Sequence, residues 1–455
     1  MLEILSYIFW VLLAITILVF VHELGHFLFA KLFKMRVERF SVGFPPKVIG
    51  RKIGETEYMI GATPLGGYVK IAGMVDESMD AEFEASEPQP WEFRAKPVWQ
   101  RVVVIVAGVI FNMILAFAIY AGLKMAYGDE YIPAENIQAV YVSDGSIAHD
   151  MGMRTGDRVI AVSGQTLERH DDLMSVEHMM SDPMTITVER GSDTLTFSGP
   201  SDIMTQLNRA GGFGISAHPS LVGSLTRNSP ALEAGIEPGD RIVGMNGRPV
   251  QFWAQVTDFM QENEGRPVEV AFIKAPEGAL IAPRTGEPVV ATVTPREMDD
   301  RYLLGVGLPA TNMLWEEFGI RTLNYGPIEA VSAGVTETWV TTRVIVTSLG
   351  RVFSGRENFR ENVGGPIAIA QVTKQAAEAG AFFFWKIVAM LSITLAIMNI
   401  LPIPALDGGH LMFLIYEVIT RREPSLRVRM VMQQVGMIVL LVFMTFVIFN
   451  DLLRL

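Results

Sequence analysis

Cysteine is absent from this chain of 455 residues. The chain therefore forms no disulfide bond and offers no thiolate to a metal, so any zinc site must use histidine and carboxylate side chains. Basic residues are outnumbered, with 37 lysines and arginines against 49 acidic residues and a net charge of −12. Because nucleic-acid binding needs a basic surface, we expect no nucleic-acid partner.

Apolar residues make up half of the chain and gather in four long runs, at residues 4–33, 98–120, 382–401 and 431–449. Each run has about the 20 residues that one crossing of a bilayer requires. The first is longer than the apolar region of a signal peptide and has no small-residue cleavage site, so we expect it to remain attached. The sequence predicts four transmembrane helices and a sizeable soluble part.

Basic residues follow the first run and precede the second and the fourth: Lys31, Lys34, Arg36 and Arg39, then Arg94, Lys96 and Arg101, then Arg421, Arg422, Arg427 and Arg429. Short loops rich in lysine and arginine stay in the cytoplasm, and all three clusters do so if the chain starts outside. Residues 34–97 then form a cytoplasmic loop. Both termini and the long segment from about 127 to 380 are external.

A further segment, residues 328–352, carries apolar side chains at helical spacing. As a fifth span it would bury Glu337 and Arg343 in the bilayer. We interpret it instead as an amphipathic helix on the external surface, packed on the protein or on lipid headgroups.

The first run contains the sequence His22-Glu23-Leu-Gly-His26. This HExxH spacing puts two imidazoles on one face of a helix, as in zinc peptidases in which the glutamate is the general base. A charge at the centre of a membrane helix costs roughly 2.5–3.5 kcal/mol on insertion scales. Ionisable residues at such a depth are functional by default, so the motif predicts peptide hydrolysis within the membrane.

The third run ends in a segment with two prolines and two glycines, from Asn399 to His410. Such a segment cannot continue a regular helix, and irregular backbone at membrane depth must be buried in protein or line a wet cavity. Asp407 is the natural third ligand, because the first and third spans run in the same direction and bring it to the depth of the histidines. His410 is the rival ligand, with helix capping as its alternative role.

Together these motifs resemble the site-2 protease family of intramembrane zinc metalloproteases. Four further stretches agree with the family, at residues 38–44, 64–70, 108–112 and 450–455, although Val109 stands where the family often has proline. The resemblance implies that Zn²⁺ is held by His22, His26 and Asp407, that Glu23 is the catalytic base, and that Asn399 holds the substrate backbone. Asn112, in the second run, is either similar substrate-binding machinery or the source of an interhelical hydrogen bond.

The external segment contains a repeat with a period of 83 residues. An S-x-A motif at residues 146–148 and a GDR motif at 156–158 recur at 229–231 and 239–241. The pattern resembles tandem, circularly permuted PDZ domains at residues 127–220 and 221–310. PDZ domains bind extended peptides by strand addition, so the pair either binds peptide tails or filters substrates sterically.

The cytoplasmic loop has strand character at residues 37–44 and 57–71, and an acidic stretch at 76–87 that we interpret as a solvated linker. The family resemblance implies a membrane-associated β element beside the active site, which would hold substrate extended by strand addition. A helical substrate hides its amides in hydrogen bonds, so it must be held extended before hydrolysis.

The predicted fold class is thus a polytopic α-helical membrane protein with four transmembrane helices, a membrane-associated β element and two tandem PDZ domains. The expected segments are: transmembrane helices at 1–33, 98–126, 381–420 and 429–455; the cytoplasmic loop at 34–97; PDZ domains at 127–220 and 221–310; and the external helix and connector at 311–380. We expect an endopeptidase of the bacterial inner membrane that cuts single-pass membrane proteins in the lipid bilayer. The resemblance further implies a substrate such as an anti-sigma factor already trimmed outside.

Two other classes of protein remain to be distinguished. A noncatalytic membrane scaffold would bind exposed peptide tails through its PDZ domains, but it has no need of an intact HExxH with a matching third ligand. A transporter would show paired discontinuous repeats in both halves, which this sequence lacks.

Overall fold

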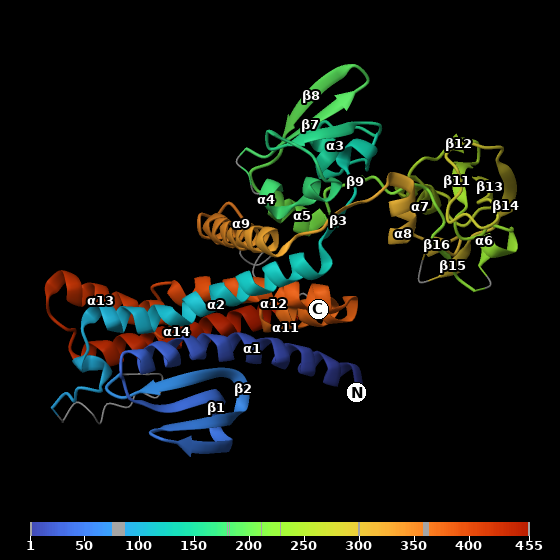
Figure 1. Ribbon diagram of the computed structural model, residues 1–455. Coiled ribbons are helices and arrows are strands. Elements are labelled where there is room, and N and C mark those ends of the chain that lie inside the picture. The colour runs from blue at the N-terminus through green and yellow to red at the C-terminus, as the bar shows by residue number, and fades with distance from the viewer. Residues whose placement is uncertain are drawn as a thin grey trace. The chain divides into compact units, whose positions relative to one another are not determined.

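The computed structural model describes residues 2–74, 87–179, 181, 183–210, 212–227, 229–298, 301–357 and 364–453 (Figure 1). The chain divides into two compact units. Unit 1 is built from Met1–Gly128, Asn324–Val352 and Phe359–Leu455, and unit 2 from Asp129–Leu323 and Phe353–Asn358. Apart from Glu87, the acidic linker expected at 76–87 lies outside the described residues.

Unit 1 is mainly helical. Its helices are α1 (Leu2–Leu32), η2 (Phe93–Ala95), α2 (Val98–Tyr127), α9 (Pro327–Phe353), α11 (Pro366–Ala379), α12 (Ala381–Ile400), α13 (Asp407–Thr420) and α14 (Leu426–Leu452). Among the described residues, α1, α2, α12 and α14 contain stretches long and apolar enough to cross a membrane. The prediction of four membrane helices is confirmed at the level of length and composition.

Helix α2 is the centre of unit 1, because it contacts α1, α12 and α13 (Figure 1). Buried side chains of α2 and α12 form one apolar cluster, which includes Tyr120 and Ile393. A second cluster joins α1 to α12 through Leu18 and Val388. These contacts bring the first and third apolar runs of the sequence to the same central helix.

The strands of unit 1 form one antiparallel pair, β1 (Val37–Ile53) and β2 (Thr56–Ile71), which lies against α1. Both strands bend, so that Tyr58 of β2 is opposite Phe40 in one half of β1 and opposite Arg51 in the other. The inner half packs on the helices through Phe40 and Val69. The outer half, residues 47–53, is exposed and forms the edge of the sheet. Strand β2 lies where the sequence predicted it, whereas β1 continues to Ile53, beyond the predicted residues 37–44.

Helix α9 packs on α2 through its small residues. Gly334 lies so close to α2 that a methyl group on it would be 2.8 Å from Cβ of Ala121. The apolar stripe on α9 is instead exposed: Ile328, Val331, Val335 and Trp339 are 49–86% accessible. The helix packs on the protein, which was one of its two expected environments, but these four side chains do not make the contact. Small residues such as Gly334 make the contact with α2, because they let two helix backbones approach closely.

Unit 2 consists of two modules, here the first module (residues 129–216) and the second module (residues 219–307), followed by α8 (Thr311–Phe318) and β18 (Arg321–Leu323). The elements of the first module are β3 (Asp129–Tyr131), η3 (Ala134–Asn136), β4 (Tyr141–Val142), α3 (Ile147–Met151), β5 (Arg158–Val162), β6 (Gln165–Thr166), η4 (His170–Met174), α4 (Val176–Met179), β7 (Thr185–Arg190), β8 (Asp193–Ser198), α5 (Ile203–Ala210) and β9 (Ile215–Ser216). Those of the second are β10 (Ser224–Leu225), α6 (Pro230–Glu233), β11 (Arg241–Met245), β12 (Arg248–Pro249), α7 (Trp253–Glu262), β13 (Val268–Ile273), β14 (Val289–Val293), β15 (Arg296–Met298), β16 (Arg301–Leu303) and β17 (Val306–Gly307).

The two modules have the same topology, as the sequence repeat requires. Each has a four-stranded antiparallel sheet, in the order β6-β5-β7-β8 and β12-β11-β13-β14. Each also pairs an early short strand with a late one, β4 with β9 and β10 with β17. Every module has its own apolar core, around Ile186 and Phe213 in the first and around Ile242 and Phe272 in the second.

The motifs that define the repeat have structural roles. Ser146 and Ser229 cap the short helices α3 and α6, each accepting a hydrogen bond from the backbone N–H three residues later. The carboxylates of Asp157 and Asp240 are 1% exposed and accept backbone N–H bonds that close the turn before β5 and β11. The serine of the S-x-A motif and the aspartate of the GDR motif therefore each have a structural role in the fold.

Candidate metal centre

Two helices far apart in sequence bring three metal-ligand side chains together. His22 and His26 lie one turn apart on α1, and Asp407 is the first residue of α13. Nε2 of His22 and Nε2 of His26 are 3.1 Å apart. Oδ2 of Asp407 lies 3.1 Å from the first of these atoms and 3.4 Å from the second. Among the described residues, this is the group whose ligand atoms could hold a metal ion.

The position of Asp407 depends on the break between α12 and α13. Helix α12 ends at Ile400, Leu401 is extended, and α13 begins only at Asp407. The intervening segment contains Pro402 and Pro404, which cannot continue a helix, and Ala405 has a φ of 85°. The break predicted from the sequence therefore puts a carboxylate at a helix start that faces α1.

Helix α2 forms the back wall of the site, and Gly108 makes this possible. A methyl group on Gly108 would lie 2.4 Å from Nε2 of His26 and 2.6 Å from Cε1 of His22. Any other residue type would push the rings away, since real Cβ atoms do not come within 3.0 Å of such neighbours. The two imidazoles therefore pack directly against the backbone of α2.

The same helix orients both rings. The backbone carbonyl of Val104 accepts a hydrogen bond of 2.8 Å from Nδ1 of His26. The side-chain amide of Asn112 is 3.3 Å from Nδ1 of His22 and is completely buried. With both Nδ1 atoms occupied, both Nε2 lone pairs point toward Asp407, which is the arrangement that metal-binding histidines have.

The amide of Asn112 has a buried oxygen, Oδ1, without a hydrogen-bond partner. Rotating the amide by 180° puts this oxygen on Nδ1 of His22, and which amide atom is oxygen is assigned from the hydrogen-bond network. Oδ1 then accepts the Nδ1–H of the neutral ring, whose Nε2 remains free for a metal. The side chain of Asn399 approaches the same ring from α12, with Nδ2 3.4 Å from Nε2.

The donor set fits zinc. Ligand bonds of about 2.0–2.2 Å in a tetrahedral site put neighbouring ligand atoms about 3.3–3.6 Å apart, close to the 3.1–3.4 Å found between these three atoms. Oδ2 of Asp407 is buried and accepts no hydrogen bond, although two imidazole nitrogens lie within ion-pair distance. A cation held by these three atoms would satisfy all three lone pairs.

Glu23 lies beside the triangle, beneath strand β2. Its side chain is half-buried and close enough to His26 for a Coulombic interaction. A methyl group on Gly67 of β2 would come within 3.2 Å of Cγ of Glu23. The strand pair β1–β2 therefore crosses directly over the turn of α1 that carries the glutamate.

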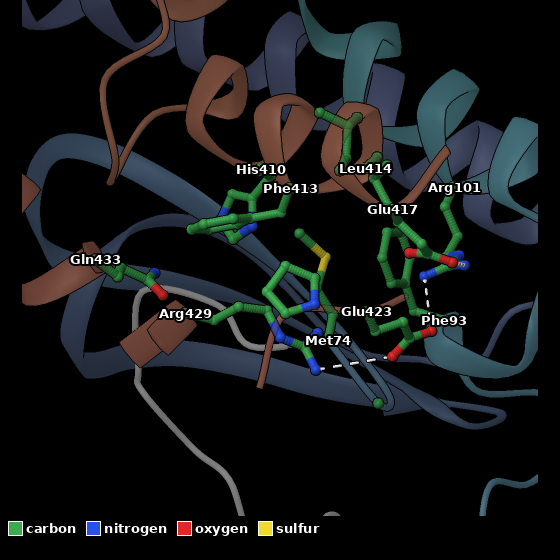
Figure 2. A pocket seen from close by; sticks show the side chains of 13 residues that line it. Met74, Phe93, Arg101, His410, Phe413, Leu414, Glu417, Glu423, Arg429 and Gln433 are labelled. Atoms are coloured by element: carbon green, nitrogen blue, oxygen red, sulfur yellow. Dashed lines mark hydrogen bonds and ion pairs between the residues drawn. The ribbon is translucent and has the colours of Figure 1, made fainter. Parts of the chain in front are cut away.

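His410, the rival ligand, lines a different pocket (Figure 2). The pocket lies between α2, α13 and α14, where Arg101 pairs with Glu417 and Glu423, and Glu423 also pairs with Arg429. Figure 2 shows the His410 ring beside Phe413, one turn of α13 beyond Asp407. His410 is not part of the three-atom group described above.

Sequence reasoning missed two contributors to this site. The Val104 carbonyl has no sequence signal, because every residue carries one. Gly108 lay in a stretch that resembles the family, at residues 108–112, but its steric role needs the position of α1. Only the relative positions of α1 and α2 show that Gly108 lies beside the imidazoles.

A family model described as peptidase family M50 matches residues 10–443. The chain belongs to this family. Regulator of sigma-E protease RseP of Salmonella typhimurium is 32% identical, and that of Escherichia coli is also 32% identical; each match covers 98% of this chain and 98% of the relative. The regulator of sigma E protease of Haemophilus influenzae is 29% identical with the same coverage. The resemblance to site-2 proteases is thereby confirmed, and the family member described here is a zinc-dependent metallopeptidase.

Proposed function

We propose that this family member is an intramembrane zinc endopeptidase in which His22, His26 and Asp407 hold the metal. The observation that carries the proposal is the triangle formed by Nε2, Nε2 and Oδ2 of these residues, with sides of 3.1–3.4 Å. It is built from two helices of the apolar unit. A noncatalytic scaffold has no use for such a triangle.

The surrounding residues have distinct roles in hydrolysis. When bound, zinc supplies Lewis acidity and makes water a nucleophile near neutral pH. Glu23 takes the proton of the attacking water and delivers it to the leaving amine. Asn399 is partly accessible at the edge of the triangle, where its amide offers a donor and an acceptor to an unwound substrate backbone. Asn112 is completely buried, so we assign it to the orientation of His22 and not to substrate binding.

The β1–β2 pair presents the substrate. Residues 47–53 form an exposed strand edge, and such an edge accepts an extended peptide as an additional strand. The inner part of β2 crosses over Glu23. A peptide held extended on this sheet would expose the amides that a helix conceals.

The two modules of unit 2 are proposed to be circularly permuted PDZ domains. The support is their shared topology and the pairing of a late strand with an early one, β9 with β4 and β17 with β10. Such domains either bind peptide tails or exclude bulky external segments, and we favour exclusion because the repeat motifs themselves serve the fold.

The substrates are proposed to be single-pass membrane proteins of the bacterial inner membrane, with both termini of this chain and unit 2 in the periplasm. Relatives from Salmonella typhimurium and Escherichia coli are named regulators of sigma E. By analogy, an anti-sigma factor already trimmed on its external side is the proposed substrate. The function is then regulated proteolysis within the membrane.

The test is cleavage of a single-pass model substrate by purified full-length protein, together with its zinc content. Glu23→Gln is expected to abolish cleavage while zinc is retained, and Asp407→Ala is expected to lose zinc. His410→Ala is the matched control on α13 and should keep its zinc. Cleavage by Glu23→Gln, or full zinc content in Asp407→Ala, would remove the corresponding assignment, and absence of zinc from the parent protein would favour the scaffold.

A further inference from the structure

The two modules of unit 2 are joined by a second connection besides the chain between them. After the second module, the chain forms α8, and the last two residues of that helix point to different modules. Glu317 contacts arginines of the second module, while Phe318 packs on the apolar core of the first. Helix α8 therefore touches both modules through adjacent residues.

Glu317 is held in a buried cluster of charges. Its carboxylate receives two hydrogen bonds from Arg241, of 2.6 and 3.3 Å, and one ion pair of 2.9 Å from Arg284. The side chains of Arg241 and Glu317 are 8% and 6% exposed. Arg241 is fixed in turn by the carbonyls of Ala282 and Pro283. Bidentate Arg–carboxylate pairs define orientation more strictly than a single hydrogen bond does.

Phe318 makes the matching attachment to the first module. Its ring packs against the buried cluster that includes Ile137 and Ala217. Its backbone carbonyl accepts a hydrogen bond of 2.6 Å from the side chain of Asn136. The chain then continues into β18, which pairs with β3 of the first module, and Arg321 forms an ion pair with Glu135.

The segment that directly connects the two modules is also held in place, by contacts with the second module. Leu221 forms a bridge with Arg241, and Pro219 one with Phe252, so the connecting segment lies on the second module like a strand. Across the junction, Tyr141 of the first module donates a hydrogen bond to Asp258 of the second. An open cavity of about 270 Å³ at this junction is lined by residues of both modules and of α8, among them Asn136, Arg241 and Glu317.

We propose that Glu317 and Phe318 form a clasp that fastens the two modules into one rigid body, and that this rigidity sets the size of external substrate segment that is admitted. Two separate attachments between the modules leave no free hinge. A filter of fixed shape discriminates by size, whereas two freely rotating modules would not. The rigid attachment of the two modules is proposed from their contacts alone, whereas its effect on the size of substrate that is admitted, the selectivity half, rests on the proposed function.

Distance measurements between spin labels test the clasp directly. Because the chain has no cysteine, labels can be attached only where cysteine is introduced, at the exposed positions Asp193→Cys in the first module and Glu277→Cys in the second. The full-length protein in nanodiscs is expected to give one narrow distance distribution. Glu317→Ala and, independently, Phe318→Ala should broaden it at least twofold.

A matched control is Glu262→Ala, which removes an exposed ion pair with Arg248 in the second module. It should leave the distribution narrow. A narrow distribution in both clasp variants, or a broad one in the parent, would overturn the clasp. Far-ultraviolet circular dichroism and the fluorescence of tryptophan distinguish loosening of the junction from unfolding of a module, and Glu317→Gln, which keeps the shape of the side chain, should broaden the distribution less than Glu317→Ala does.

Selectivity is tested by cleavage of a single-pass substrate with and without a folded external domain. The clasp variants should cut the trimmed substrate at the parent rate and the untrimmed one at least fivefold faster than the parent. An unchanged ratio of the two rates, with a broadened distance distribution, would overturn the selectivity half. If the parent cuts neither substrate, the proposed function fails while the distance result still decides the clasp.

Discussion

Replacing Gly108 by alanine tests whether helix α2 shapes the metal centre. The added methyl group would lie 2.4 Å from Nε2 of His26, whereas an ordinary contact begins near 3.4 Å. The ring, or α1 with it, must therefore retreat by the difference, about 1 Å. The ligand triangle has sides of only 3.1–3.4 Å, so this displacement is large relative to the site.

The expected loss of zinc affinity follows from how metal sites respond when their ligands are no longer held in the right orientation. Disturbing the groups that orient metal ligands typically reduces metal affinity or activity about 10- to 100-fold, and a misplacement of about 1 Å can cost 10²-fold in rate. We expect the zinc affinity of Gly108→Ala to fall about 10- to 100-fold, which corresponds to about 1.4–2.7 kcal/mol. Cleavage should fall at least as much, because the reacting groups are displaced as well.

The assay is chelator competition for zinc, with cleavage of a single-pass substrate measured in parallel. Gly122→Ala is the matched control, because it lies on the same helix and a methyl group there meets nothing within 4 Å. It should change neither quantity by more than about twofold, since alanine favours a helix over glycine. If Gly108→Ala behaves like this control, the close packing of the imidazoles on α2 does not shape the site and the reasoning is refuted.

Three further changes probe contacts of single residues. Asn112→Leu should reduce zinc affinity about 10- to 100-fold, because His22 loses the partner of its Nδ1 atom; chelator competition measures this, and Asn112→Asp should retain most of the affinity. Asp451 accepts three backbone N–H bonds at the start of α11, so Asp451→Ala should destabilise that helix by about 0.5–2 kcal/mol; faster hydrogen exchange in residues 366–379 is the readout, and unchanged exchange would contradict it. Burial lowers the pKa of His170 and of His218 below 6.5. The unfolded chain then binds more protons than the folded one between the lowered pKa and 6.5, so unit 2 should lose stability as the pH falls through that window and regain it above 6.5. Thermal unfolding at pH 7.5 and 5.5 checks this, and His218→Gln should reduce the loss.

The long apolar helices and the grouping of His22, His26 and Asp407 were predictable because their signals are local. A span must satisfy its backbone internally over about 20 residues, and α2 indeed begins at Val98, where the apolar run begins. His22 and His26 share a helix face by spacing alone. Asp407 follows a proline-rich break, and the structure places it at the first position of the next helix.

Features that depend on distant partners were not predictable. The periodicity of α9 revealed an apolar stripe, but the stripe is exposed and Gly334 makes the contact with α2. Which face of α9 contacts α2 depends on the position of Ala121 on α2. The pairing of Arg241 with Glu317 spans 76 residues. Arg241 belongs to the repeated GDR motif, but the motif gives no sign of a partner that lies after the repeat.

The glycine inside the HExxH motif of this chain shows that contacts with a distant segment can restrict a residue within a local sequence motif. The motif leaves its fourth position open, since only the histidines and the glutamate carry the chemistry. Here Gly25 occupies that position, and a methyl group on it would lie 2.5 Å from the carbonyl oxygen of Ala107 on α2. Gly108, the next residue on α2, makes the reciprocal contact with the imidazoles. Gly408, directly after Asp407, would likewise collide with the carbonyl of Leu401 if it carried a side chain, at 2.0 Å. Each ligand-bearing segment is thus held by close approach of one backbone to another. Backbone contacts of this kind have fewer ways to yield than side-chain contacts, so the geometry of the site is set by the packing of the helices before any metal binds.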